Sequence, residues 1–137
     1  MVSATRGKAV PGVTKTQETI TITRDAYGIP HILAETDEGA MFGLGYVSAE
    51  DRMLQMEYSR RVVQGRLAEM LGDVGTRGSS TVDSDIRYSH QQIYSHCREL
   101  IGLLNEDVRN LLRAYSAGVN LYILKNLLRL HPLFAKL

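Results

Sequence analysis

The sequence predicts an α+β fold in which an N-terminal antiparallel β-hairpin is followed mostly by α-helices. Residues 19–24 alternate threonine and isoleucine before the final arginine, which is the period of a strand with one buried face. Residues 29–34 form a second short apolar run, and the turn sequence Asp25-Ala26-Tyr27-Gly28 separates the two. From residue 37 onward the apolar residues recur mainly with the period of helices, interrupted by a loop at 72–84 that is rich in Gly, Ser and Thr.

Length and composition narrow the class of protein. A chain of 137 residues, with 44% hydrophobic and 23% charged residues, can form one domain with a core. The net charge of +1 argues against a nucleic-acid-binding protein. A single cysteine, Cys97, excludes an intrachain disulfide and a zinc site built from several thiolates. Residues 1–18 are predicted to be a flexible segment without the apolar core of a signal peptide, and no apolar run is long enough to span a membrane.

The hairpin is expected to be one edge of a larger sheet, because two strands alone are marginally stable in water. Gly28 suits a turn, since it adopts positive φ without a steric penalty. Pro30 lacks an amide hydrogen, so its strand should lie at an edge or pair only at its beginning.

A long helical pattern follows the hairpin. Thr36 is the predicted N-cap, and the pattern continues to Leu71, with Gly72 as the residue that ends it. The run is long for one uninterrupted helix. The expected break or close-packing points are its three glycines, Gly43, Gly45 and Gly65.

Two further helices are predicted after the loop. The first covers residues 85–104, and Asn105 caps the second. Seven apolar side chains of the second helix recur at helical spacing and should need a partner surface: Val108, Leu111, Leu112, Tyr115, Val119, Tyr122 and Ile123. Residues 127–137 are crowded with Leu and Phe, so we expect residues 19–137 to be a truncated piece of a longer protein or one chain of a complex.

Several side chains could carry chemistry, and each has a structural explanation. His31 could approach a site, but a hydrogen bond inside the sheet is the favoured interpretation. His90, His96 and Cys97 point in different directions on a helix, so shared metal ligation is not expected and Cys97 should be a buried thiol. The acidic residues Glu50, Asp51 and Glu57 lie near arginines, which favours ion pairs that tie a helix to the sheet or to another subunit.

The segment 20–72 resembles the start of the α-subunit of the penicillin acylases, a family of N-terminal-nucleophile amide hydrolases. The likeness rests on short motifs in the family's order, including RDAYGIPHI, GLGYV, AEDR, QME, RR, QG and LAEMLG. Glu50 stands where glutamine is usual, and Leu54 where an aromatic residue is common. A looser likeness continues to residue 137. The motif residues to which we give a structural role are Arg24, Asp25, Gly28, Pro30, His31, Gly43, Gly45, Tyr46, Asp51, Arg52, Gln55, Met56, Arg60, Arg61 and Gly65.

This resemblance implies a fragment of a four-layer αββα sandwich, built by two subunits that are cut from one self-cleaving precursor. The nucleophile would be the first residue of the β-subunit, with its own α-amine as the base. The resemblance therefore implies no catalytic, cofactor-binding or metal-binding residue in this chain, and it names the β-subunit and the rest of the α-subunit as partners. The substrates would be N-acyl amides such as β-lactam side chains or acyl-homoserine lactones.

No cofactor is expected for catalysis. A structural calcium would fit the complete enzyme, with its ligands outside this chain, and the resemblance suggests a periplasmic or secreted protein. Two other interpretations remain: a non-catalytic orphan fragment without a downstream nucleophile, and a helical protein-interaction module. A β-subunit region in the gene would argue against the first. A stable, cooperatively folding isolated chain would favour the second.

Overall fold

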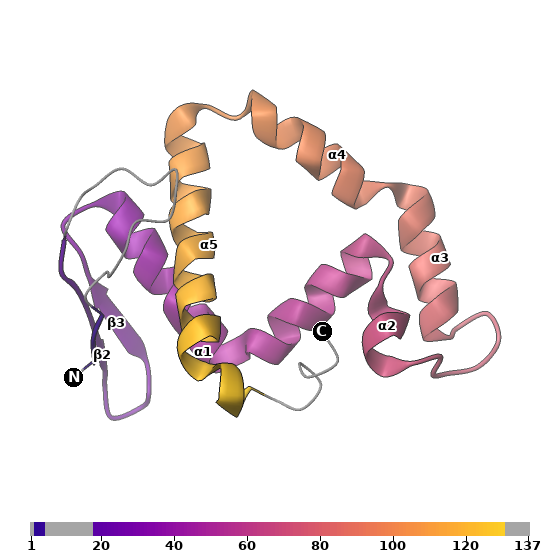
Figure 1. Cartoon of the computed structure of the whole chain (residues 1–137), viewed down its shortest axis with the longest axis horizontal. Helices are drawn as coiled ribbons and strands as arrows, with labels where there is room; N and C mark the ends of the chain where they lie inside the picture. The colour runs from indigo at the N-terminus through magenta and orange to yellow at the C-terminus, as the bar shows by residue number, and fades with distance from the viewer. Residues whose placement is uncertain (1, 5–17, 131–137) are drawn as a thin grey trace. The chain divides into compact units, whose positions relative to one another are not determined.

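The structure, a computed structural model, describes residues 2–4 and 18–130 (Figure 1). The chain forms two compact units. Of the described residues, 2–4, 18–51 and 105–127 form the first unit, and 52–104 and 128–130 form the second. Most of the predicted flexible segment and most of the apolar C-terminal run lie outside the described residues.

The sheet of the first unit contains β1 (Val2–Ala4), β2 (Ile20–Arg24) and β3 (Pro30–Leu33), in the order β1-β2-β3. Both pairs are antiparallel, and Ile22 of β2 lies opposite Ile32 of β3. The predicted hairpin is therefore confirmed, with each strand slightly shorter than expected. Pro30 begins β3, at the edge of the described sheet, as its missing amide requires. β1 was not predicted, since its residues fall in the segment expected to be flexible.

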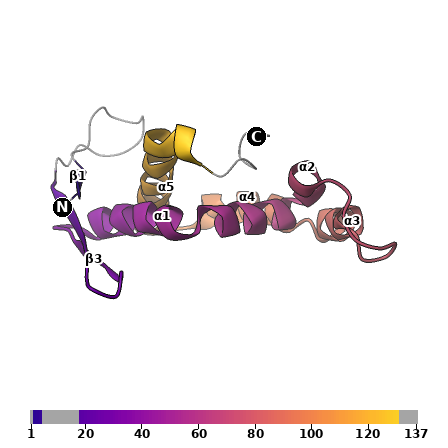
Figure 2. The ribbon, with the colours of Figure 1, turned by 90° about the horizontal axis from the view of Figure 1, so that it is seen from below.

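The first unit is completed by the beginning of α1 (Asp37–Gln64) and by α5 (Glu106–Asn126). Both predicted caps are confirmed: Thr36 Oγ1 accepts the amide hydrogen of Gly39 at 3.0 Å, and Asn105 Oδ1 accepts that of Val108 at 2.8 Å. α5 lies across the first part of α1 in two perpendicular views (Figures 1 and 2). The core between sheet and helices consists of Ile20, Ile22, Phe42, Tyr46, Val47 and Ala114.

The face that α5 buries differs from the predicted stripe. Ala114 and Gly118 are its buried residues, flanked by Ala117, Leu121 and Tyr122, whereas Val108 and Leu112 of the stripe remain exposed. Small residues occupy the contact because the two helix backbones approach closely. A pattern of large apolar side chains does not reveal a contact made by alanine and glycine.

This close approach confirms the packing role expected for Gly43 and Gly45. A Cβ atom at Gly45 would meet the backbone carbonyl of Tyr115, and one at Gly118 would meet that of Phe42. A Cβ atom at Gly43 would lie 2.5 Å from Cγ2 of Ile32 in the sheet. The absence of a Cβ atom at these glycines therefore lets α1 pack closely against both α5 and the sheet.

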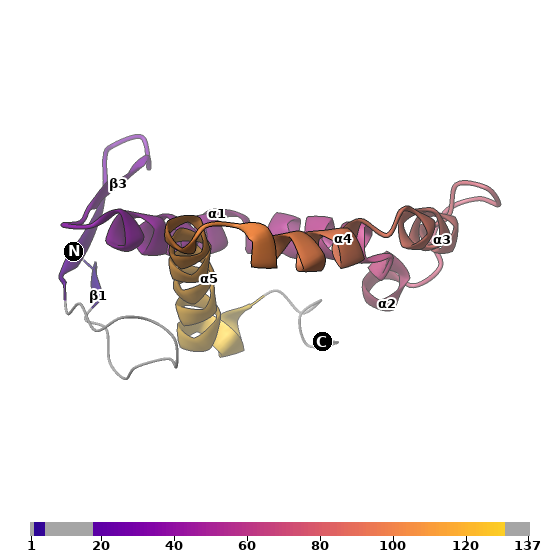
Figure 3. The same ribbon diagram turned by 90° about the horizontal axis from the view of Figure 1, so that it is seen from above.

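The second unit begins where α1 departs from helical geometry, at Arg52 (φ −140°, ψ 25°), a break that the sequence did not predict. α1 ends at Gln64, and Gly65 (φ +65°) leads into α2 (Leu67–Leu71). The break expected at Gly65 is confirmed, so the helix predicted to run to Leu71 is two helices. α2 lies beside α3 (Thr81–Gln91) in Figures 1 and 3.

The helix predicted over 85–104 is wrong in its start and in its continuity. α3 begins at Thr81, because Ser80 and Asp83 form a reciprocal capping box. Gln92, with φ +52°, then separates α3 from α4 (Ile93–Leu100). Short 3₁₀ turns η1 (Ile101–Leu103) and η2 (Leu127–Arg129) follow α4 and α5. Among the residues that the structure describes, no helix has the length and apolar character needed to cross a membrane.

Candidate functional site

Arg24, at the end of β2, is the centre of a charged cluster in the first unit. Its Nη2 donates to Glu50 Oε2 and to Asp51 Oδ1, each at 2.6 Å, and its Nη1 donates to the carbonyl of Gly28 at 2.7 Å. One side chain thereby holds the β2–β3 turn and the first part of α1 together. We call Arg24, Glu50 and Asp51 the Arg24 cluster.

The Arg24 cluster confirms that acidic residues of the helix pair with an arginine of the sheet. Glu50 and Asp51 are neighbours on the helix, yet both bind the same arginine. The guanidinium reaches both carboxylates through Nη2, whose two N–H groups point in different directions, and Nη1 also donates to Asp51 Oδ2 at 3.3 Å. Hydrogen bonds to Glu50 and then to Asp51 raise the pKa of Arg24 above its already high ordinary value.

The turn itself is organised by Asp25. Its Oδ1 accepts the amide hydrogens of Tyr27 and Ile29, each at 2.9 Å, and these bonds, that from Ile29 first, hold the pKa of Asp25 below its ordinary value. His31 Nε2 lies 3.4 Å from Asp25 Oδ2, and the His31 side chain is 62% exposed. The expectation that His31 is bonded inside the sheet is therefore wrong, because its side chain is on the outer face of β3.

Tyr46 lies in the core of the first unit. Its ring meets that of Tyr122 edge to face, with centroids 5.6 Å apart, and Lys125 Nζ lies 5.8 Å from its centroid. Burial raises the pKa of the Tyr46 hydroxyl, with a smaller contribution from the charge of Glu50. The residue joins α1 to α5 and remains protonated at neutral pH.

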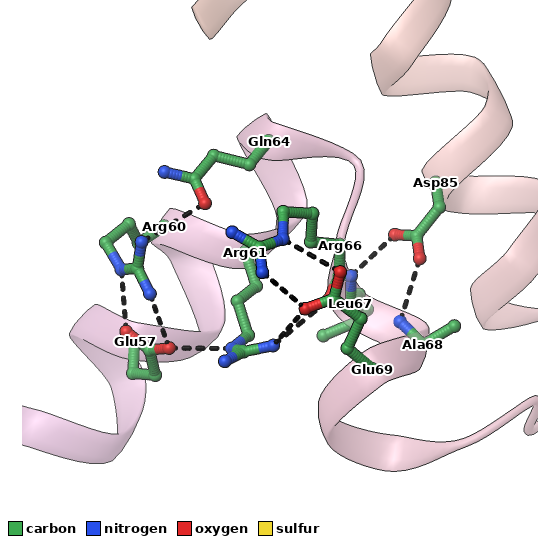
Figure 4. A network of polar contacts seen from close by, with 9 residues as sticks. All are labelled: Glu57, Arg60, Arg61, Gln64, Arg66, Leu67, Ala68, Glu69 and Asp85. Carbon is green, nitrogen blue, oxygen red and sulfur yellow. Dashed lines mark hydrogen bonds and ion pairs between the residues drawn. The ribbon is translucent and has the colours of Figure 1, made fainter. Parts of the chain in front are cut away.

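A second cluster is centred on Glu57 in α1 (Figure 4). Glu57 Oε1 accepts from Nε of Arg61 at 2.6 Å, and both side chains are almost fully buried. Arg60 donates two further bonds to Glu57, at 2.7 and 2.8 Å. Burial alone would raise the pKa of Glu57, but the hydrogen bonds from Arg60 and Arg61 outweigh it and hold that pKa below its ordinary value. These residues and Glu69 form the Glu57 cluster.

The Glu57 cluster continues into α2. Arg61 Nη1 lies 3.1 Å from Glu69 Oε2, and Arg66 donates to both carboxylate oxygens of Glu69 at 2.8 Å. Asp85 of α3 accepts the amide hydrogens of Leu67 and Ala68 at 2.7 and 2.8 Å. One carboxylate from a distant helix therefore satisfies the first amides of α2, as Figure 4 shows.

Sequence reasoning missed the roles of Glu69 and Asp85. Glu69 follows Arg66 by three residues, which is a usable helical pairing signal. Asp85 lies 17 and 18 residues from the amides that it binds, so no local pattern links them.

The remaining motif residues are placed as follows. Arg52 is the residue at the break in α1, and its Nη1 donates to Gln55 Oε1 at 3.4 Å. Met56 is half-buried. Gly28 has φ +80° at the tip of the β2–β3 turn. A Cβ atom at Gly65 would meet the Ser89 hydroxyl and the Asp85 carbonyl, so this glycine lets α1 end against α3.

The other candidates do not form a site. His90, His96 and Cys97 are all exposed, so the prediction of a buried Cys97 thiol is wrong: α4 buries none of its residues. In the part of the chain that the structure describes, no three His, Cys, Asp or Glu side chains are grouped as a metal site would require. The carboxylates of the two clusters are suited to holding elements together, because each accepts hydrogen bonds from an arginine.

Comparisons with known proteins agree with the motifs. Residues 19–134 match the family model described as penicillin amidase. The chain is 36% identical over 115 residues to penicillin acylase 2 proenzyme of Pseudomonas sp. (strain SE83), covering 84% of this chain and 14% of that protein. It is 38% identical over 104 residues to penicillin G acylase of Escherichia coli, covering 76% and 12%. It is 33% identical over 108 residues to acyl-homoserine lactone acylase QuiP of Pseudomonas fluorescens (strain Pf0-1), covering 79% and 12%.

The fold agrees as well. A thermostable penicillin G acylase from Alcaligenes faecalis superimposes with a TM-score of 0.72 at 30% identity, covering 82% of this chain and 56% of that chain. The hairpin followed by helices thus matches a fragment of a penicillin acylase fold. The chain spans only about one seventh of the length of the curated relatives that it matches.

Proposed function

The chain belongs to the penicillin amidase family, and from that premise we propose that it is the N-terminal α-subunit portion of a penicillin acylase-like amidohydrolase. The complete enzyme would hydrolyse the amide bond between an acyl group and an amine. The observation that carries the proposal is the family match over residues 19–134, which includes the residues of both charged clusters. The rest of the α-subunit and the β-subunit would be its partners.

The role of this chain in that enzyme is structural. The Arg24 cluster fixes the β2–β3 turn against α1, and the Glu57 cluster fixes the end of α1 to α2. The small residues of the α1–α5 contact hold α5 close to the sheet. Such a scaffold would support a wall of the acyl pocket, while the reacting groups come from elsewhere.

The nucleophile is proposed to be the first residue of a β-subunit released from the same precursor. An α-amino group is a suitable base for a neighbouring hydroxyl or thiol, because its ordinary pKa of about 8 is near neutral pH. The name proenzyme of the Pseudomonas relative supports processing. The shares of the relatives that this chain covers also support processing. The chain spans 14% of that proenzyme but 56% of the solved Alcaligenes chain, as expected if the solved chain is a processed subunit.

The substrate class is proposed from the relatives, which are named as penicillin acylases and acyl-homoserine lactone acylases. Both substrate types contain an acyl group linked to an amine by an amide bond. No cofactor is needed for such a hydrolysis. A structural calcium is proposed for the complete enzyme only, held by residues outside this chain.

The test is to express the complete gene that encodes this chain and to analyse the product by mass spectrometry and amide hydrolysis. We expect two subunits, a β-subunit that begins with Ser, Cys or Thr, and release of free amine from a penicillin or an acyl-homoserine lactone. Alanine in place of that first residue should abolish hydrolysis, while Asp107→Asn in this chain, an exposed first-turn residue of α5, should leave it unchanged. An uncut, inactive product would instead identify a non-catalytic orphan.

A further inference from the structure

The helix α4 has one apolar face and one polar face. At about 100° per residue, Ile93, Cys97 and Leu100 fall within one narrow arc of the helix. Ser95, Arg98 and Glu99 occupy the opposite arc. We call the first group the α4 apolar face.

None of the described residues of its own unit buries the α4 apolar face. Ile93 is 36% exposed and Leu100 is 56% exposed, and Cys97 is exposed between them. None of the residues of α3, α4 or η1 is buried. The apolar surface continues into η1, where Ile101 and Leu103 are also exposed.

A helix of this kind needs a partner for its stability. Isolated helices shorter than about 12 residues are marginal in water, and the helices of proteins gain most of their stability by packing an apolar face. α4 has eight residues and is preceded by Gln92 in the left-handed conformation, so it is not extended by α3. The amphipathic sequence and the lack of burial therefore indicate the same missing contact.

We infer that the α4 apolar face is the docking surface for the part of the α-subunit that lies beyond the segment matched here. The solved Alcaligenes relative has much additional chain, since this chain spans 56% of it. A covalently continuous segment reaches this face at high effective concentration, unlike a separate chain. The face carries no charged residue, so its partner surface is apolar. The identity of the partner rests on the proposed function.

The native Cys97 thiol tests whether the face is covered, without any substitution. In the complete enzyme we expect a maleimide to modify Cys97 at least about tenfold more slowly than a cysteine on the polar face, because thiol reactivity follows exposure. The matched control is Ser95→Cys in a Cys97→Ser background, two positions away on the same helix. Equal rates at the two positions would overturn the inference.

A photo-cross-linking residue at Leu100 identifies the partner in the same enzyme. We expect mass spectrometry to find the cross-linked peptide in the α-subunit, beyond the segment that matches residues 19–134. A cross-link to the β-subunit, to a second copy or to this chain itself would overturn the assignment, as would no cross-link. Amide hydrolysis is measured separately: an inactive enzyme with a protected Cys97 contradicts the proposed function alone, and an active enzyme with a reactive Cys97 contradicts the inference alone.

Discussion

Glu57 shows how burial decides the importance of a charged residue. Its carboxylate is almost fully buried and binds two arginines, one of which, Arg61, is equally buried. Glu69 binds Arg61 and Arg66 with similar distances, but its side chain is half exposed. Water can replace the partners of Glu69, and it cannot easily replace those of Glu57. The two residues therefore form a matched pair for mutation.

Glu57→Gln should destabilise the protein by about 3 kcal/mol, because it leaves the guanidinium of Arg61 buried without a counter-charge. Glu69→Gln should have a much smaller effect. Thermal unfolding of the complete enzyme and of both variants, monitored by circular dichroism, measures the difference. Equal shifts for the two variants would show that burial of the Glu57 cluster is not what makes it important.

The same carboxylate makes stability depend on pH. Because arginine hydrogen bonds hold the pKa of Glu57 below its unfolded value, its stabilisation is present above that unfolded value, near pH 4.3, and is lost as pH falls through the folded pKa. The unfolding temperature of the unmodified enzyme should therefore fall on acidification. The difference in unfolding temperature between the unmodified enzyme and Glu57→Gln should narrow at the same time, since protonated Glu57 resembles glutamine. A difference in unfolding temperature that stays constant from pH 7 to pH 3 would contradict a stabilising role for the Glu57 carboxylate.

The helices and strands of the chain could be predicted wherever the signal is local. Thr36 and Asn105 cap helices within three residues of the amides that they bind, and the β2–β3 turn contains its own Asp and Gly. The breaks at Arg52 and Gln92 have no glycine or proline, so no local signal predicts them. The buried face of α5 was misjudged because small residues form the contact.

Gly118→Ala tests that contact directly. Alanine is the better helix former, so the change would stabilise an isolated helix by about 1 kcal/mol. In the protein its Cβ atom would meet the Phe42 carbonyl, and we expect a net loss of about 1–3 kcal/mol. The control is Asn120→Ala, two residues away at an exposed position of the same helix, which should be neutral or slightly stabilising. The measurement is the unfolding temperature of each variant. A higher unfolding temperature for Gly118→Ala would refute the close approach of α5 to α1 at this position.

Asp85→Ala tests how α2 is held. The carboxylate accepts the amide hydrogens of Leu67 and Ala68, so its removal leaves these donors unpaired and should cost about 1 kcal/mol. The effect should appear locally as faster hydrogen exchange at those two amides. Asp107→Asn, in the first turn of α5, should leave the same amides unchanged. Unaltered exchange in Asp85→Ala would show that α2 does not depend on this bond.

Contacts between residues far apart in the sequence could not be predicted from the sequence alone. The pairing of Glu50, Asp51 and Glu57 with arginines followed from their neighbourhood, but the particular partners did not. Arg24 lies 26 and 27 residues from the acids that it binds, and Asp85 lies 18 and 17 residues from the amides that it binds. Such contacts are products of the tertiary fold. His31 and Cys97 were misplaced for the same reason, because burial depends on which elements come to cover a strand or helix.

The same dependence predicts how the isolated chain behaves. Its described residues bury few large apolar side chains, whereas Leu33, Leu100, Leu103 and Leu128 are more than half exposed. Without the rest of the proposed enzyme, we expect the 137-residue chain to bind a hydrophobic dye strongly and to unfold without a sharp thermal transition, the behaviour of a loosely packed state. The complete enzyme is the matched control and should bind little dye. A sharp transition of the isolated chain without dye binding would instead favour an independent interaction module, because only a chain that covers its own apolar faces unfolds cooperatively.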